Sequence, residues 1–253
     1  MIIRIISGIF LFIFAVTFFL YANNTVSAIF FCGISMTAVF EMSNILGNRK
    51  LRYFILLLTL IIHALFYFNL YFYIVPVFYI SFLLLFIYNI LMDSINIENY
   101  QNLIFYFLFC ILPFSIMNQL FISQKKLLGA IIVMVALYDS LAYFTGVKYG
   151  KKRPFAKISP KKSIEGIIGG SLAVIFAGIM FFYSMNYSSD IFWAVIAVIT
   201  LAPAGDLSVS ILKRVKNIKD SGFLIPGHGG ILDRMDSYVF LIPALYFIGV
   251  LNG

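Results

Sequence analysis

The sequence is poor in charge: Asp, Glu, Lys and Arg together supply 11% of its 253 residues, against about 25% in soluble domains. Hydrophobic residues supply 62% of the chain, whereas about 45–50% is usual. These values exclude an ordinary globular protein and favour a polytopic helical membrane protein. The length suits one membrane domain and leaves no room for a sizeable soluble module.

Cysteine is almost absent, and no segment has the composition of a linker. Cys32 and Cys110 each lie in a predicted membrane span without a paired motif, so we expect inert core residues that say nothing about the redox compartment. His63, alone in an aromatic-rich span, is expected to be a packing residue bonded to backbone. Internal repeats and Gly-Ser-rich or Pro-rich stretches are also absent. The 29 Phe and 16 Tyr residues fit lipid and interface packing, and we expect no nucleic-acid partner.

Long apolar runs are what the sequence has in abundance. A transmembrane helix needs about 20 mostly apolar residues. Nine such runs lie near 4–22, 26–44, 53–70, 72–92, 103–122, 127–147, 165–184, 190–213 and 236–251. We therefore predict an all-α fold, a polytopic integral membrane helix bundle with about nine transmembrane helices. Residues 1–21 imitate a secretory signal peptide, but apolar runs continue throughout, so we interpret them as a retained first span.

The basic residues predict the orientation in the membrane. If the N-terminus is cytoplasmic, 16 of the 18 Lys and Arg residues fall in segments on the cytoplasmic side, and the exceptions are Lys125 and Lys126. Cytoplasmic loops carry such an excess of positive charge. The distribution therefore supports a cytoplasmic N-terminus and two cytoplasmic polar loops. A bacterial plasma membrane is favoured because the chain is short and has no soluble N-terminal extension; an endoplasmic reticulum membrane is the alternative.

Acidic residues are the scarcest charged type, ten in all, and six of them lie between positions 139 and 236. These six are Asp139, Glu165, Asp206, Asp220, Asp233 and Asp236. Asp139 follows more than a turn of apolar residues, and we expect it to be buried. An acid there is a candidate functional residue by default, although a pair with a nearby lysine is the alternative. The other four, Glu41, Asp93, Glu98 and Asp190, lie at or near predicted span ends, and we interpret them as solvated loop residues.

Residues 203–214 are predicted to place a carboxylate, a hydroxyl and two cations on one helical face. Asp206, Ser210, Lys213 and Arg214 stand at positions i, i+4, i+7 and i+8. The alternative is an ion pair between Asp206 and a basic residue one or two turns on, which would stabilise the helix end. That alternative leaves the block that follows unexplained.

The block from Pro226 to Asp236 surrounds a histidine with glycines and ends in two acids. Three glycines around His228, among them Gly229 and Gly230, permit backbone turns barred to other residues and let amide groups approach a ligand. For His228 itself, proton transfer, a phosphate contact and a role in the turn all stay open, with the last two favoured.

Asp233 and Asp236 are spaced i, i+3 and can share one helical face. Together with Asp206 they form a candidate Mg²⁺ site, because Mg²⁺ prefers carboxylate and phosphate oxygens. Lys213, Arg214 and Lys219 fit as counter-charges for a polyphosphate, since arginine can contact phosphate through two donors.

Two stretches carry motifs of fixed residues. One is Ser210-x-x-Lys213-Arg214-x₄-Lys219-Asp220-x-Gly222-x₃-Pro226-x-His228-Gly229-Gly230-x-x-Asp233-Arg234-x-Asp236, preceded by Gly205-Asp206-Leu207. The other combines Asp139-x-x-Ala142-Tyr143-x-x-Gly146 with Ser159-Pro160-Lys161-Lys162-Ser163-x-Glu165-Gly166. Both resemble motifs of the phosphatidate cytidylyltransferases (CDP-diacylglycerol synthases), over roughly residues 135–245. The sequence departs at Tyr138, where asparagine is usual, and at Ser163-Ile164, where Thr-Trp is usual.

The resemblance implies Mg²⁺-dependent nucleotidyl transfer in phospholipid biosynthesis: CTP and phosphatidic acid give CDP-diacylglycerol and pyrophosphate. It implies catalytic roles for Asp206, Lys213, Arg214, Asp233 and Asp236, with the metal on the three aspartates and a monovalent ion such as K⁺ as an optional second cation. The substrate-binding residues it implies are Ser210, Lys219, His228, Gly229, Gly230, Lys161, Lys162 and Asp139. Its implied partners are CTP, phosphatidic acid, membrane lipid and a second copy in a homodimer.

The resemblance also divides the chain. Residues 1–134 would embed the protein in the membrane and offer dimer contacts, and residues 135–253 would form the catalytic region. Two other functions stay open: a related CTP-dependent enzyme acting on a prenyl-ether phosphate or a polyprenol, and a transporter with an intramembrane ion site. The transporter leaves the glycine-histidine block and the cytoplasmic charge excess unexplained.

Overall fold

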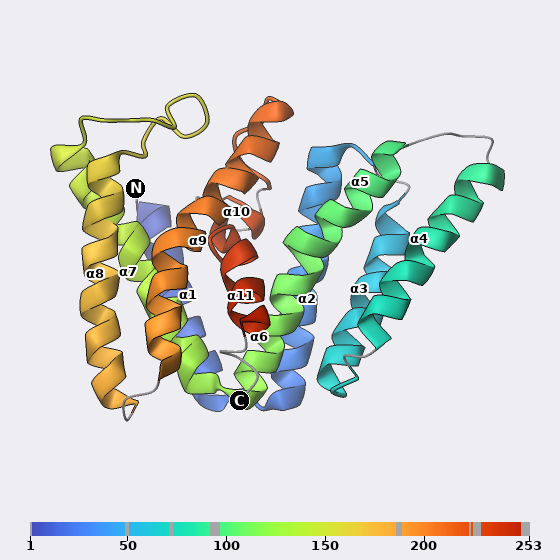
Figure 1. The fold of residues 1–253 in the computed structure, drawn as a ribbon, viewed down its shortest axis with the longest axis horizontal. Helices are drawn as coiled ribbons and strands as arrows, with labels where there is room; N and C mark the ends of the chain where they lie inside the picture. The colour runs from blue at the N-terminus through green and yellow to red at the C-terminus, as the bar shows by residue number, and fades with distance from the viewer. Residues whose placement is uncertain are drawn as a thin grey trace. The chain divides into compact units, whose positions relative to one another are not determined.

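The computed structural model describes residues 2–48, 51–70, 73–91, 97–185, 189–222, 224 and 229–248, and within those ranges the regular structure is helical throughout (Figure 1). The helices are α1 Ile2–Tyr21, α2 Asn24–Leu46, α3 Arg52–Tyr67, α4 Ile74–Leu91, α5 Ile97–Tyr106, the π-helical η2 Phe107–Ile111, α6 Leu112–Ser123, α7 Lys125–Tyr149, α8 Ile164–Ser184, α9 Ser189–Val215, α10 Leu232–Met235 and α11 Tyr238–Phe247. The predicted all-α fold is confirmed.

Each predicted span contains a helix, but the count of nine membrane crossings is not confirmed. Among the residues that the structure describes, five helices are long and apolar enough to cross a membrane: Asn24–Leu46, Glu98–Ser123, Lys125–Tyr149, Ile164–Ser184 and Ser189–Val215. α3 has 16 residues and α11 has 10, fewer than the about 20 that a perpendicular span needs. The protein is therefore an integral membrane protein, and five of its described helices have the length and composition of membrane spans.

The chain divides into two compact units. Unit 1 comprises Met1–Ile122 and Asp220–Leu232, and unit 2 comprises Ser123–Lys219 and Asp233–Gly253. The segment Asp220–Leu232 lies late in the sequence and yet belongs with the N-terminal helices. The boundary expected between residues 134 and 135 separates motif-bearing residues from the rest, and it stays a prediction about function.

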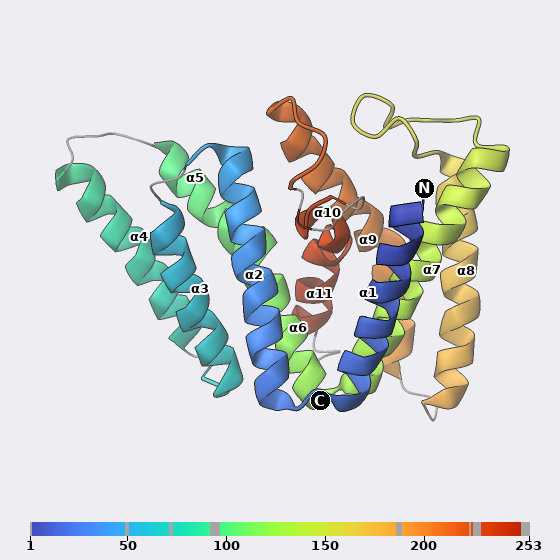
Figure 2. The same cartoon turned by 180° about the vertical axis from the view of Figure 1, so that it is seen from behind.

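In unit 1, α2 packs against α3 and η2, and α2 and α3 lie side by side in Figure 2. Asn23 caps the start of α2, where its side chain accepts a hydrogen bond from the Val26 amide, and Gly47, with φ 76°, caps the end. Ser35 donates to the Cys110 carbonyl at 2.5 Å. His63 is buried, with Nδ1 3.0 Å from the Thr59 carbonyl, which confirms its expected packing role.

In unit 2, α7 and α8 form a close pair that α9 and α11 extend (Figures 1 and 2). Glycine permits the close approach: a Cβ at Gly166 would lie 2.7 Å from the Ala142 carbonyl oxygen. The connecting loop returns to the start of α8, where Ser163 accepts a hydrogen bond from the Gly166 amide at 3.1 Å. Glu165 accepts from the Lys151 amide at 3.0 Å.

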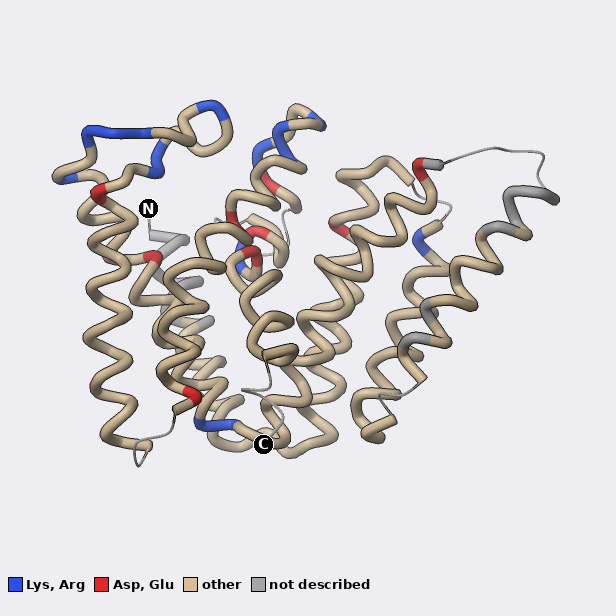
Figure 3. The backbone as a smooth tube through the Cα atoms, viewed as in Figure 1, with Lys and Arg blue, Asp and Glu red and all other residues tan. Residues whose placement is uncertain are grey.

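The basic residues of unit 2 gather at one end of its helices, on the α7–α8 loop and on the C-terminal part of α9 (Figure 3). Lys125 and Lys126 begin α7 at its opposite end. A helix of 25 residues separates those ends by about 37 Å, at about 1.5 Å per residue. Within unit 2, the charges are therefore segregated along the helix axes as the sequence predicted.

Candidate active site

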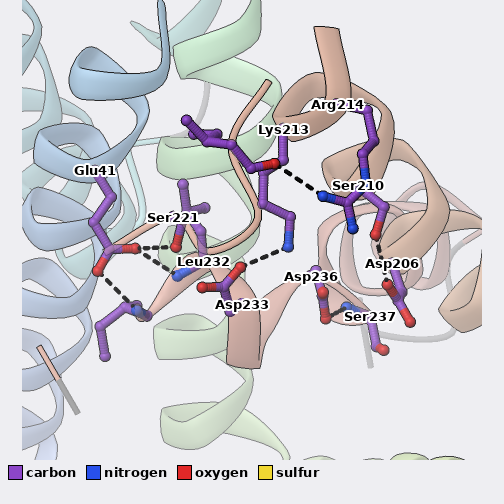
Figure 4. A network of polar contacts seen from close by, with 12 residues as sticks. Glu41, Asp206, Ser210, Lys213, Arg214, Ser221, Leu232, Asp233, Asp236 and Ser237 are labelled. Carbon is purple, nitrogen blue, oxygen red and sulfur yellow. Dashed lines mark hydrogen bonds and ion pairs between the residues drawn. The ribbon is translucent and has the colours of Figure 1, made fainter. Parts of the chain in front are cut away.

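In the last turns of α9, Asp206 and Ser210 are in contact as their helical spacing predicted, whereas Lys213 pairs with Asp233. Ser210 Oγ donates to Asp206 Oδ1 at 3.2 Å, and Lys213 Nζ lies 2.6 Å from Asp233 Oδ1 (Figure 4). Only 9% of the Lys213 side chain and 10% of the Asp233 side chain are exposed to solvent. Because this pair is enclosed, solvent screens the attraction between its charges less than it does in an exposed ion pair.

The Arg214 side chain lies on the exposed side of α9. Its Nε donates to the Ile158 carbonyl at 3.3 Å, and a terminal nitrogen donates to the Ile218 carbonyl at 3.0 Å. The residue itself is exposed. Arg214 thus joins the α7–α8 loop to the segment after α9, and its guanidinium stays accessible to a ligand from solvent.

The α7–α8 loop supplies a second cation, the half-buried Lys162. Lys162 Nζ lies 2.7 Å from Asp206 Oδ2 and 3.3 Å from the Pro203 carbonyl oxygen. Lys161, its neighbour, is exposed, as are Lys219 and Asp220 after α9. Of the two lysines predicted in this motif, Lys162 therefore contacts the aspartate cluster, whereas Lys161 faces outward.

Asp139 of α7 is exposed by surface area, whereas the sequence predicted burial; the surrounding protein still desolvates its carboxylate. The apolar residues before it continue its helix but do not enclose its own side of α7. The carboxylate nevertheless lies within electrostatic range of Asp206, Lys162 and Arg234. An accessible acid beside this cluster can contact a ligand directly.

Asp236 lies in the turn between α10 and α11, and 9% of its surface is exposed. Its Oδ1 accepts a hydrogen bond from the Ser237 amide at 2.8 Å. Burial raises the pKa of the Asp236 carboxyl well above its usual range, the charge of Asp206 raises it further, and Lys213 opposes them. A buried acid beside a second carboxylate is stabilised by a bound cation or a proton.

The donor chemistry of these aspartates fits a hard divalent cation. The ammonium group of Lys162 lies 2.7 Å from Asp206, and that of Lys213 lies 2.6 Å from Asp233. Each ammonium group occupies a position at which a metal cation would bind the carboxylate. In the part of the chain that is described, no three His, Cys, Asp or Glu residues surround one common metal position. The three-aspartate centre therefore stays a prediction, and it requires Lys162 and Lys213 to exchange their carboxylates for another anion.

The glycine-histidine block is described only in part. His228 lies outside the described residues, as do Pro226 and Gly227. Gly229 has φ 87°, in the left-handed region that favours glycine, which agrees with the permissive backbone expected there. Gly230 is buried in unit 1.

Glu41 of α2 is the residue that sequence reasoning missed. It was expected to be solvated, and that expectation is wrong because 5% of its surface is exposed. Its carboxylate accepts hydrogen bonds from Ser221 Oγ at 2.8 Å and from the Ile231 and Leu232 amides at 2.9 Å each (Figure 4). One signal could have found it: Glu41 lies inside the predicted span 26–44, where an acid marks a functional residue by default.

The contact between α9 and the Asp236 turn predicts the effect of a single methyl group. A Cβ at Gly205 would overlap the Asp236 backbone oxygen. We expect Gly205→Ala to destabilise the protein by about 1–3 kcal/mol. We also expect activity to fall about 100-fold, because a displacement of about 1 Å can cost that much. Thermal melting and turnover of the purified variant measure both.

Gly33→Ala is the matched control for that variant. A Cβ at Gly33, in the interior of α2, would meet no atom within 4 Å, so helix propensity alone should stabilise the protein by up to about 1 kcal/mol. If Gly205→Ala behaved like Gly33→Ala, the close approach at Asp236 would be contradicted.

Comparison with known proteins agrees with the motifs. Residues 2–251 match the family model described as "Cytidylyltransferase family". The chain is similar to the phosphatidate cytidylyltransferase of Thermotoga maritima, at 39% identity over 132 residues that cover 47% of this chain and 48% of the relative. It is also similar to that of Bacillus subtilis, at 42% over 122 residues, covering 46% and 44%. For the Rickettsia felis protein of the same name, the values are 38% over 154 residues, covering 56% and 68%.

The chain thus matches about half the length of the Thermotoga and Bacillus relatives. The family match, in contrast, extends over nearly the whole sequence and includes both charged segments of unit 2. The protein belongs to the cytidylyltransferase family.

Proposed function

We propose that the protein is a phosphatidate cytidylyltransferase, a nucleotidyltransferase that converts CTP and phosphatidic acid into CDP-diacylglycerol and pyrophosphate. The observation that carries this proposal is the aspartate–lysine cluster of unit 2, where Lys162 and Lys213 each hold a carboxylate at 2.7 and 2.6 Å. Such a cluster in a chain with five membrane-length helices fits a reaction between a charged nucleotide and a lipid. The names of the relatives support the same substrates.

The chemistry requires placement and charge neutralisation more than proton transfer. A phosphate oxygen of phosphatidic acid attacks the α-phosphorus of CTP, the bond from that phosphorus to the β-phosphate oxygen breaks, and pyrophosphate leaves. The attacking phosphate is already an anion, so no strong base is needed. The barrier lies in bringing two anions into line, which is achieved by positioning and electrostatics.

The residues of unit 2 supply those two effects. Lys162 and Lys213 can exchange carboxylate for phosphate, and the exposed Arg214 guanidinium can bind phosphate through two donors. Ser210, which donates to Asp206 at 3.2 Å, can donate to a phosphate oxygen instead. We assign Lys161, Lys219 and the accessible Asp139 to substrate contact at the same end of the helices.

Asp206, Asp233 and Asp236 would hold Mg²⁺, with a monovalent ion such as K⁺ as a second cation. The bound metal would neutralise phosphate charge and polarise the phosphoryl oxygens. Asp236 fits this role because its carboxylate is buried beside that of Asp206 and favours a bound cation. We place His228, Gly229 and Gly230 beside the triphosphate, as the family motif implies.

We further propose that the site faces the cytoplasm of a bacterial plasma membrane and that the protein acts as a homodimer. The charge segregation within unit 2 supports the first statement, because its basic end carries the cluster and cytoplasmic segments are rich in Lys and Arg (Figure 3). CTP is available on that side.

The lipid substrate is tested by offering the purified protein CTP with one lipid at a time. Phosphatidic acid, a prenyl-ether phosphate and a polyprenol form the panel, and mass spectrometry identifies the product. We expect a CDP-lipid with phosphatidic acid and a rate at least tenfold lower with the others. A product from the prenyl-ether phosphate alone, or a phosphorylated polyprenol without bound cytidine, would contradict the proposal.

A further inference from the structure

The buried carboxylate of Glu41 lies at the centre of a small, fully polar contact set in unit 1. α2 supplies the acid, and the segment Asp220–Leu232 supplies its donors: the Ser221 hydroxyl at 2.8 Å and the Ile231 and Leu232 amides at 2.9 Å. The two amides are consecutive, and Oε1 accepts from Ile231 while Oε2 accepts from Leu232 and Ser221. Both carboxylate oxygens are therefore used.

Two glycines leave room for this carboxylate. A Cβ at Gly222 would lie 2.7 Å from Glu41 Oε1, and one at Gly230 would overlap Oε2. Contacts at 2.7 Å are closer than van der Waals packing allows for carbon and oxygen. The segment backbone thus lies close to the Glu41 carboxylate at two places, one near each end of the segment. Glycine at both positions permits this approach.

The residues that bond Glu41 lie close to the two ends of the segment, where the chain continues into unit 2. Asp220 follows Lys219, and Leu232 precedes Asp233, the partner of Lys213. Consecutive Cα atoms are about 3.8 Å apart, so fixing the Leu232 amide limits where the Asp233 backbone can lie. Glu41 lies in the C-terminal part of α2 but still within the helix, and the helix gives the acid a rigid base.

We propose that Glu41 is a positioning residue: its carboxylate holds the segment Asp220–Leu232 and thereby sets the position of Asp233 for the reaction proposed above. The inference rests on that proposed function for its catalytic part. The role needs a carboxylate rather than any polar side chain, because three donors converge on two oxygens. A glutamine offers one acceptor oxygen and turns an NH₂ group toward a donor.

Glu41→Gln tests the proposal with nearly unchanged side-chain volume. We expect kcat/KM to fall about 10- to 100-fold and the Mg²⁺ concentration for half-maximal activity to rise, as is usual when the support of a metal ligand is lost. Ser35→Ala is the matched control. It lies on the same helix, is buried, and loses a hydrogen bond to the Cys110 carbonyl, which lies outside the segment. Its activity should stay within about twofold of wild type.

A double variant separates positioning from simple destabilisation. Ser221→Ala removes one of the three donors, so its effect should be smaller than that of Glu41→Gln. Because the serine acts through Glu41, the pair Glu41→Gln/Ser221→Ala should lose little more activity than Glu41→Gln alone. If Glu41→Gln lowers the melting temperature as Ser35→Ala does but keeps wild-type kcat/KM and Mg²⁺ dependence, the proposal is overturned.

Trypsin cleavage after Lys219 supplies a readout that needs no activity. Lys219 is exposed, and release of the adjoining segment should make its peptide bond easier to cleave. We expect cleavage of Glu41→Gln to be at least fivefold faster than that of Ser35→Ala, and equal rates would overturn the positioning role. If wild type forms no CDP-lipid, the proposed function fails, whereas the cleavage rates still decide whether Glu41 holds the segment.

Discussion

Asp233→Asn and Asp236→Asn are each expected to lower the rate of CDP-lipid formation about 1,000-fold, equivalent to about 4 kcal/mol of transition-state stabilisation. An amide keeps the size of the side chain but removes its charge and one strong oxygen ligand. Asp236 is buried beside Asp206, so the lost charge would not be replaced by solvent. Turnover of the purified variants at saturating CTP and Mg²⁺ measures the loss.

Asp190→Asn is the control for those variants. Asp190 lies in the first turn of α9, at the opposite end of the helix from Asp206. Its substitution should leave turnover within about twofold of wild type. Retained activity in both Asp233→Asn and Asp236→Asn would show that the metal assignment is wrong, even if CDP-lipid formation itself stood.

Lys213→Met should destabilise the protein more than Gly205→Ala does. The Nζ–Oδ1 distance to Asp233 is 2.6 Å and both side chains are about nine-tenths buried. Removing one partner of such a pair leaves a buried, uncompensated charge, which costs about 3–5 kcal/mol. We expect a lower melting temperature in detergent, and we expect added Mg²⁺ to recover part of the loss, since a bound cation would again neutralise Asp233.

The double variant Lys213→Met/Asp233→Asn distinguishes a charge effect from a packing effect. Replacing both members of a buried ion pair is often nearly neutral for stability, so the double variant should melt within a few degrees of wild type. It should nevertheless be inactive, because a phosphate-binding cation and a metal ligand are both missing. A double variant as unstable as Lys213→Met would indicate that Lys213 stabilises the protein through packing of its methylene chain.

The helices, and the polar residues that repeat along α9, could be predicted from the pattern of neighbouring residues in the sequence. Apolar runs of about 20 residues have one stable structure in lipid, and the spacing of Asp206, Ser210 and Lys213 follows from helical geometry. The number of crossings could not be predicted in the same way, because α3 and α11 are shorter than a full span. Lys162 and Asp206 were both predicted at the site, but their 2.7 Å pairing joins a loop to a helix 44 positions later and has no local signature.

Glu41 and Asp139 show where sequence patterns fail. Glu41 lies near a helix end, which is typical of solvated acids, and its donors are about 180 to 190 positions away in the chain. Backbone amides carry no residue-specific signal, so no motif could mark Ile231 and Leu232 as its partners. Asp139 follows apolar neighbours, yet exposure depends on which face of α7 its neighbours cover, and this is set by tertiary packing.

The most direct test of the account follows the phosphorus atoms of CTP. Purified protein is given phosphatidic acid, Mg²⁺ and CTP labelled either at the α-phosphate or at the γ-phosphate. If the protein is a phosphatidate cytidylyltransferase, only the α label enters the lipid, the γ label is recovered in pyrophosphate, and the two products form in equal amounts. Transfer of the γ label to lipid, or no transfer of either label, would contradict this assignment.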